Sequence, residues 1–181
     1  MRRNVIVLQD RASRTNVPGA GCARVSQIRG RVGCAELIEL RVASPNRIAP
    51  PCRYHGLGAG ACGGCPWQFV TYAEQLIRKQ QRVENSLQRI GVAAPIRAIE
   101  PSPLQWGYRN RAQLKTDGVR LGFVARGSNT LVAVEHCPVL SAPNNETLAK
   151  LQAQLPCRAW HPSRKHHRTT LDIDETRAPG V

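Results

Sequence analysis

The sequence predicts an α+β protein that is mainly β, in which short strands surround one long helix. Apolar residues recur with a period of two in several short runs bounded by turn residues. They recur with helical period in one long stretch, residues 71–91. Thirteen prolines and fifteen glycines agree with many short elements joined by turns. We divide the chain into residues 1–50, 51–70, 71–95 and 96–181.

Residues 1–50 contain the β-type runs "NVIVL" and "AELIELRV", which predict a small β barrel or sheet. Residues 51–70 form a loop rich in glycine and cysteine. In the helix that follows, Thr71 and Glu74 match a capping box, and Gly91 supplies a left-handed stop. The apolar stripe of this helix needs a partner, and the chain offers few large ones.

The segment 96–181 returns to a period of two. The runs "RNRAQLKT", "VRLGFVA" and "TLVAVEH" predict a three-stranded antiparallel meander with a hairpin turn at Asp117-Gly118. A helix is predicted in "LSAPNNETLAKLQAQL", with Pro143 in its first turn. "TTLDID" predicts one more strand, and a lone strand at the terminus indicates an incomplete β domain.

The chain is strongly basic, with a formal net charge of +14. Such an excess favours a polyanionic partner, most often nucleic acid, although a bias toward arginine in the composition is an alternative. The meander carries basic residues that form a candidate platform for RNA phosphates or, alternatively, the polar face of an exposed sheet. They are Arg109, Arg111, Lys115, Arg120 and Arg126.

No apolar run is long enough for a signal peptide or for the ~20 residues of a membrane span. We therefore expect a cytoplasmic protein with no membrane partner and with reduced thiols. Cys62 and Cys65 form a Cys-Gly-Gly-Cys knuckle, Cys52 precedes it, and Cys137 ends a strand before a proline. Three local thiolates plus one distant thiolate are a common layout for a [4Fe–4S] cluster; a zinc site and unligated buried cysteines are the alternatives.

Four stretches, "ASPNRIAPPC", "CGGCPWQF", "KQQRVENSLQRIG" and the segment from "WGYRNRAQLKT" to "EHCPVLSAPNNETL", occur in this order. Together they resemble the RNA uracil-C5 methyltransferases that carry an iron–sulfur cluster, above all the bacterial 23S ribosomal RNA 5-methyluridine enzymes. The resemblance covers roughly residues 35–150. It implies that Cys52, Cys62, Cys65 and Cys137 bind a [4Fe–4S] cluster.

The resemblance also implies an N-terminal TRAM domain, an OB-like β barrel, which is degenerate here because its usual Leu-Pro-Gly-Glu stretch is absent. In this family the helix matching residues 71–91 packs on a C-terminal Rossmann-like domain. That domain supplies the S-adenosylmethionine loop, the nucleophilic cysteine and the carboxylate base, and we find no counterpart of it in this sequence. We therefore assign no catalytic residue and expect a truncated chain that is inactive alone.

The expected function is that of the N-terminal part of an S-adenosylmethionine-dependent 23S rRNA (uracil-C5) methyltransferase. This part would bind ribosomal RNA and a [4Fe–4S] cluster and act in rRNA processing, with a separately encoded C-terminal half as a candidate partner. The alternative is a free-standing iron–sulfur or zinc RNA-binding module. The sequence leaves open whether the chain by itself is an enzyme.

Overall fold

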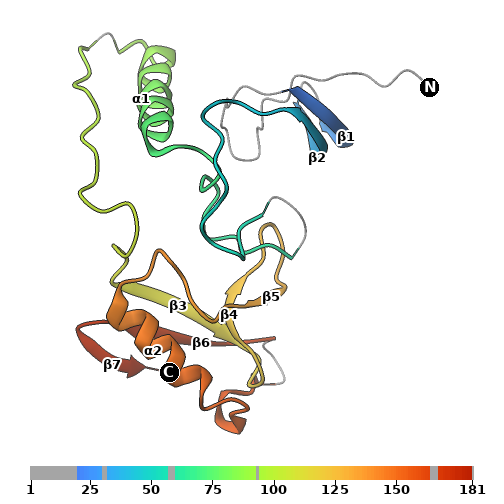
Figure 1. The fold of residues 1–181 in the computed structure, drawn as a ribbon, viewed down its shortest axis with the longest axis vertical. Coiled ribbons are helices and arrows are strands. Elements are labelled where there is room, and N and C mark those ends of the chain that lie inside the picture. The colour runs from blue at the N-terminus through green and yellow to red at the C-terminus, as the bar shows by residue number, and fades with distance from the viewer. Residues whose placement is uncertain (1–19, 30–31, 57–59, 93, 164–166, 181) are drawn as a thin grey trace. The chain divides into compact units, whose positions relative to one another are not determined.

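The computed structural model divides the chain into two compact units (Figure 1). Unit 1 contains residues 1–50 and 67–102, and unit 2 contains residues 51–66 and 103–181. The Cys-rich loop therefore belongs to the same unit as the predicted meander. The residues that the structure describes are 20–29, 32–56, 60–92, 94–163 and 167–180.

The described part of unit 1 begins with a two-stranded antiparallel hairpin, β1 (Ala20–Arg29) and β2 (Val32–Val42). The register shifts at three places along the pair, so the hairpin is irregular. The run "AELIELRV" is a strand as predicted, whereas "NVIVL" lies outside the described residues. The OB-like barrel stays a prediction.

Helix α1 (Tyr72–Arg89) confirms the long helix, and Gly91 has the predicted left-handed conformation, with φ of 77°. The capping box is wrong, because the side chain of Thr71 makes no capping hydrogen bond. Glu74 is buried and its carboxylate has other partners: it accepts a hydrogen bond from Asn46 Nδ2 at 3.0 Å and forms an ion pair with Arg78. A buried carboxylate needs such partners to offset its lost hydration.

An extended segment, residues 94–102, follows α1 and bonds to side chains of this helix. The N–H of Ile99 donates to Gln80 Oε1 at 2.8 Å, and the N–H of Ser102 donates to the hydroxyl of Tyr72 at 2.7 Å. Part of the apolar stripe of α1 stays exposed, with Val83 at 51%.

Unit 2 contains a five-stranded antiparallel sheet of order β5-β4-β3-β6-β7 (Figure 1). Its first three strands in chain order confirm the predicted meander. The expectation of a lone terminal strand is wrong, because β6 lies between β3 and β7 and its Leu171 and Ile173 are buried. The strands are β3 (Arg111–Thr116), β4 (Leu121–Val124), β5 (Leu131–Ala133), β6 (Thr169–Asp174) and β7 (Arg177–Gly180).

Helix α2 (Ala142–Gln152) covers one face of this sheet, with Pro143 in its first turn as predicted, and a short 3-10 turn (Arg158–Trp160) follows it. Alternate residues of β3 point toward α2 and are buried, whereas those between them point away and are more exposed. The buried residues of the sheet, of α2 and of the segments around it form one core. They are Ala112, Leu114, Leu121, Leu140, Leu148, Leu151, Trp160, Leu171 and Ile173.

Candidate functional site

The cysteine knuckle of unit 2, residues 62–65, is joined to the end of β4 through the backbone. Its first cysteine forms an isolated antiparallel bridge just beyond this strand. The N–H of Gly63 donates to the carbonyl of Val124 at 3.0 Å, and the N–H of Arg126 donates to the carbonyl of Ala61 at 3.1 Å. The knuckle is thus held as a short extra strand would be.

The two glycines of the knuckle have different surroundings. A Cβ atom at Gly63 would lie 3.2 Å from the backbone N and Cα of Arg126 and from the carbonyl oxygen of Val124, so a side chain here would require this backbone to shift by a few tenths of an ångström. A Cβ atom at Gly64 would lie 3.7 Å from the sulfur of Cys62, an ordinary contact. The N–H of Gly64 donates a hydrogen bond to that sulfur.

Cys52 is brought to the knuckle by a tight turn. The N–H of His55 donates to the carbonyl of Cys52 at 3.0 Å, and the N–H of Cys62 donates to the carbonyl of Tyr54 at 2.9 Å. The second bond connects the two ends of the stretch between Cys52 and Cys62. The nine residues in this stretch therefore do not keep Cys52 away from the knuckle.

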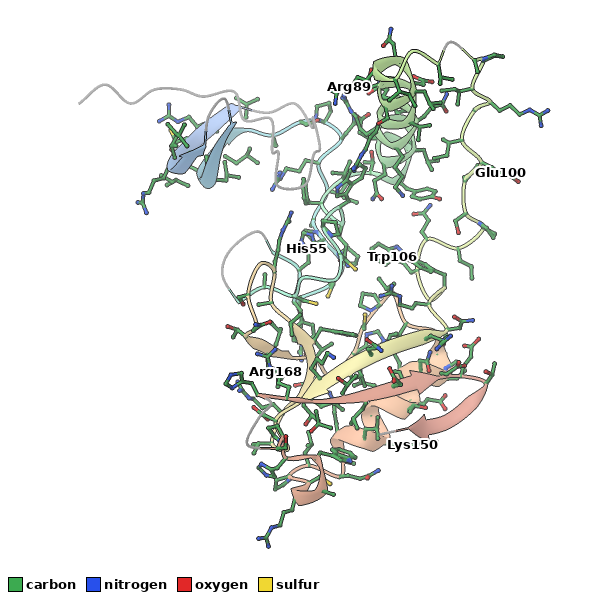
Figure 2. The ribbon with its side chains drawn as sticks, turned by 180° about the vertical axis from the view of Figure 1, so that it is seen from behind. His55, Arg89, Glu100, Trp106, Lys150 and Arg168 are labelled. Atoms are coloured by element: carbon green, nitrogen blue, oxygen red, sulfur yellow. The ribbon has the colours of Figure 1, made fainter. Side chains whose placement is uncertain are left out.

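The predicted cysteine ligands all belong to unit 2. Burial raises the pKa of the Cys62 thiol above its ordinary value of 9.0, the hydrogen bond from Gly64 opposes this rise, and Cys65, Cys137 and Cys52 each add to it. The structure therefore brings the other three predicted thiols within electrostatic range of Cys62. Sulfur atoms, drawn in yellow, lie near the meeting of the 51–66 loop and the sheet of unit 2 (Figure 2).

In the described ranges of the chain, no three or more histidine, cysteine or acidic side chains form a group that could hold a metal ion as they stand. The absence of such a group is compatible with the electrostatic interactions at Cys62, because charged groups interact over distances well beyond the ~2.3 Å of a metal–sulfur bond. The donor set itself fits an iron–sulfur cluster, which takes cysteine thiolates as ligands. In a [4Fe–4S] cluster each thiolate ligand binds a different iron, so the four ligand sulfurs lie farther apart than four sulfurs on a single zinc ion.

Two side chains that sequence reasoning missed hold the segment before and at Cys137. The hydroxyl of Tyr54 accepts a hydrogen bond from the N–H of Glu135 at 3.0 Å, and Asn145 bonds to both the N–H and the carbonyl of Cys137. A signal for Asn145 was present in the sequence. Asparagine is a poor residue for a helix interior and prefers to bond nearby backbone, so the pair Asn144-Asn145 indicated a local contact.

Three of the predicted RNA-binding residues have side-chain partners within unit 2. Arg111 forms an ion pair with Asp174 at 3.3 Å, although its side chain is 74% exposed. Lys115 donates to the hydroxyl of Thr170 at 2.6 Å. Arg120 donates two hydrogen bonds to Asp117, at 2.7 and 2.9 Å, in the β3–β4 turn.

The exposed face of β3 is therefore mixed in charge. Asp172 and Asp174 of β6 lie directly opposite Gln113 and Arg111 in the register of the sheet, where paired residues share a face. These carboxylates reduce the positive potential of the predicted platform.

Arg109 and Arg126 lie outside this face. Arg109 is exposed and precedes β3; its backbone pairs with the segment after Cys137, with its N–H donating to the carbonyl of Val139 at 2.9 Å. Its guanidinium makes no hydrogen bond or ion pair with the described residues. Arg126 is half-buried and adjoins the cysteine knuckle through the bond of its N–H to Ala61. Both basic residues thus belong to the surroundings of the cysteines.

Helix α1 and the other helices in the described part of the chain are too short or too polar to cross a membrane. No family model matches the sequence. Comparison with curated proteins, in contrast, finds clear relatives.

The chain is 39% identical over 148 residues to an uncharacterised RNA methyltransferase of Nitrosomonas europaea, a match that covers 80% of this chain and 38% of the relative. It is 36% identical over 140 residues to the 23S rRNA (uracil(1939)-C(5))-methyltransferase RlmD of Pseudomonas putida, covering 74% of this chain and 30% of that protein. The enzyme of the same name from Halomonas elongata is 36% identical over 138 residues, covering 74% of this chain and 28% of that protein. The matches thus span between a quarter and two fifths of these relatives. Over about three quarters of its length, the chain belongs to the family of RNA methyltransferases that includes the 23S rRNA (uracil-C5)-methyltransferases.

Proposed function

We propose that this chain is the RNA-binding and iron–sulfur part of an S-adenosylmethionine-dependent 23S rRNA (uracil-C5) methyltransferase. The observation that carries the proposal is the gathering of Cys52, Cys62, Cys65 and Cys137 in one unit, with Cys62 subject to the charge of the other three. The names of the relatives support rRNA as the substrate and methyl transfer as the reaction.

The cysteine thiolates of this site would hold a [4Fe–4S] cluster. Held by these cysteines, the cluster would link the 51–66 loop to the segment that follows β5 and would supply a structural centre there. The N–H of Gly64 already donates to the sulfur of Cys62 and would stabilise a thiolate there.

RNA binding would rest on phosphate contacts rather than on base recognition. Arg109 is the strongest candidate, since it is exposed, close in sequence to the sheet and without a competing carboxylate among the described residues. Arg111 and Arg120 would have to exchange a carboxylate partner for a phosphate, which reduces the net gain from each contact.

Methyl transfer to C5 of uracil requires a covalent nucleophile, a base for the C5 proton and a pocket for the methyl donor. We assign none of these roles to a residue of this chain. The chain alone is therefore expected not to methylate RNA. Labelled S-adenosylmethionine with unmodified 23S rRNA tests this, and label in 5-methyluridine would contradict it; label only after adding a separately expressed C-terminal half would show a split enzyme.

The metal content of anaerobically prepared protein tests the cluster directly. We expect a brown protein with broad absorption at about 400 nm and about four irons per chain. Replacing Cys62, Cys65 or Cys137 with serine should abolish the absorption, whereas Cys157→Ser should keep it, because Cys157 is not among the thiols that act on Cys62. Stoichiometric zinc without iron after anaerobic reconstitution would favour the zinc module and overturn the cluster.

RNA affinity at several salt concentrations tests the basic residues. Each lost phosphate contact should reduce the slope of log K against log salt by about 0.7–0.9. We expect Arg109→Glu to reduce this slope more than Arg120→Glu, because the guanidinium of Arg120 is already held by Asp117. Equal slopes for wild type and all five charge reversals would show that these basic residues make no phosphate contacts and form only the polar face of an exposed sheet.

A further inference from the structure

After β5 ends, side chains as well as backbone bonds hold the segment that carries Cys137. The carbonyl of Val134 accepts a hydrogen bond from the side chain of Gln152, and the N–H of Glu135 donates to the hydroxyl of Tyr54. The N–H and carbonyl of Cys137 both bond to Asn145. Backbone bonds hold the residues on either side, with the N–H of Val134 donating to the carbonyl of Leu121 at 3.1 Å and the N–H of Arg109 to that of Val139 at 2.9 Å. The N–H of Cys137 itself donates to a side chain, so the placement of Cys137 depends on Asn145.

Asn145 holds Cys137 with both ends of its carboxamide. Its Oδ1 accepts from the N–H of Cys137 at 2.9 Å, and its Nδ2 donates to the carbonyl of Cys137 at 3.0 Å and to that of Leu140 at 3.1 Å. Because an amide oxygen only accepts and an amide nitrogen only donates, these bonds define one orientation of the side chain. The position of Cys137 is then fixed relative to α2.

Helix α2 is a rigid support for this contact. Leu148 and Leu151, on the same helix, are buried in the core of unit 2 at 0% and 7% exposure. Asparagine is less favourable than alanine inside a helix, so Asn145 does not serve the helix itself. Its contribution lies in the hydrogen bonds to the corner.

We propose that Asn145 is the positioning residue of Cys137, orienting the one distant thiolate toward the three cysteines of the 51–66 loop. This inference rests on the proposed function, in which Cys137 is a ligand of the cluster. Residues that orient metal ligands through hydrogen bonds affect metal affinity by about 10–100-fold, and Asn145 is expected to act in this range.

Asn145→Ala and Asn145→Asp test the role, with Asn144→Ala as the matched control. Asn144 is fully buried on the same helix and donates to the carbonyl of Arg109 at 3.4 Å, so its loss perturbs the fold without touching Cys137. Asn145→Asp keeps the shape and the acceptor for the N–H of Cys137 but places a second acceptor against the two carbonyls. Asn145→Asp should therefore fail to restore the positioning of Cys137 that Asn145→Ala loses.

Two measurements are made on each reconstituted full chain: the rate of iron loss to a chelator and the electron paramagnetic resonance spectrum of the reduced cluster. Both Asn145 variants should lose iron about 10-fold faster or more and show a shifted spectrum. Asn144→Ala should keep the wild-type spectrum and rate. In the metal-free proteins, amide hydrogen exchange at Cys137 should accelerate in Asn145→Ala alone.

The outcomes separate the two proposals. A wild type that takes up no iron overturns the proposed cluster and this inference with it. A wild type that holds iron, together with Asn145 variants that retain both its spectrum and its rate of iron loss, overturns the role of Asn145 only. The same holds if Asn144→Ala and Asn145→Ala change both readouts equally.

Discussion

The knuckle glycines provide a sharp test of how the Cys-rich loop packs. Gly63→Ala places a Cβ atom 3.2 Å from three backbone atoms, two of Arg126 and one of Val124. Backbone atoms cannot rotate away as a flexible side chain can, so the knuckle and the end of β4 must separate by a few tenths of an ångström. This separation strains the hydrogen bonds that join them, at 3.0 and 3.1 Å.

The expected magnitude follows from two opposing effects. Overpacking costs about 1–3 kcal/mol, while replacing glycine by alanine restricts the unfolded chain and stabilises by about 0.4–1 kcal/mol. Gly63→Ala should thus destabilise unit 2 by about 0.5–2 kcal/mol. Gly64→Ala meets only the sulfur of Cys62 at 3.7 Å and should be neutral or stabilising by up to about 1 kcal/mol.

Urea unfolding of the two metal-free variants measures the difference. The fluorescence of Trp160, which is buried in the core of unit 2, reports on this unit when Trp67 and Trp106 are replaced by phenylalanine. We expect a lower midpoint for Gly63→Ala and an unchanged or higher midpoint for Gly64→Ala. Equal midpoints would refute the packing of the knuckle on β4.

Three further changes test other parts of unit 2. Leu148→Ala should cost about 2–5 kcal/mol of unfolding free energy in urea, since this side chain is completely buried; a smaller loss would contradict the core. Tyr54→Phe should speed amide exchange at Glu135 while Cys137 stays protected, and no change at Glu135 would exclude the hydrogen bond. Partial burial acts to raise the pKa of Asp117, but hydrogen bonds from Arg120 outweigh it and hold the pKa below its ordinary 3.8. Its stabilisation is therefore present above about pH 4 and lost as the pH falls through the lowered pKa, so Asp117→Asn should be less stable than wild type at pH 7, and this difference should shrink as the pH falls below about 4.

The fold of unit 2 was largely predictable because local signals agreed with one another. The turn at Asp117-Gly118 and the alternating runs on either side of it specified β3 and β4 without reference to the rest of the chain. The place of β6 was not predictable in this way. Pairing between β6 and β3 joins residues far apart in sequence, and no local pattern encodes which strand a distant segment will meet.

The candidate site was predicted as a set of residues but not as an arrangement. Cysteine spacing identified the thiols, because three of them share one short loop. The supporting contacts of Tyr54 and Asn145 depend on tertiary packing and carried weaker sequence signals. The same limit applies to the basic platform: alternation along β3 placed Arg111 and Lys115 on one face, but Asp174 came from a strand whose register could not be read in advance.

A metal centre bound by both Cys65 and Cys137 would stabilise unit 2 by closing a long loop of the chain. The chain leaves unit 2 after Pro66 and returns to it at Pro103, so Cys65 and Cys137 are separated by an excursion through unit 1. A centre bound by both cysteines closes a loop of about 70 residues, and closing a loop of that length in the unfolded chain corresponds to about 4 kcal/mol in the chain-entropy model of covalent cross-links. The link between Cys52 and Cys62 closes a loop of only about ten residues and contributes less by the same relation. The distant thiolate of Cys137 would thus contribute more to the stability of unit 2 than Cys52 does. That difference gives a physical reason for anchoring Cys137 through its backbone to a helix buried in the core.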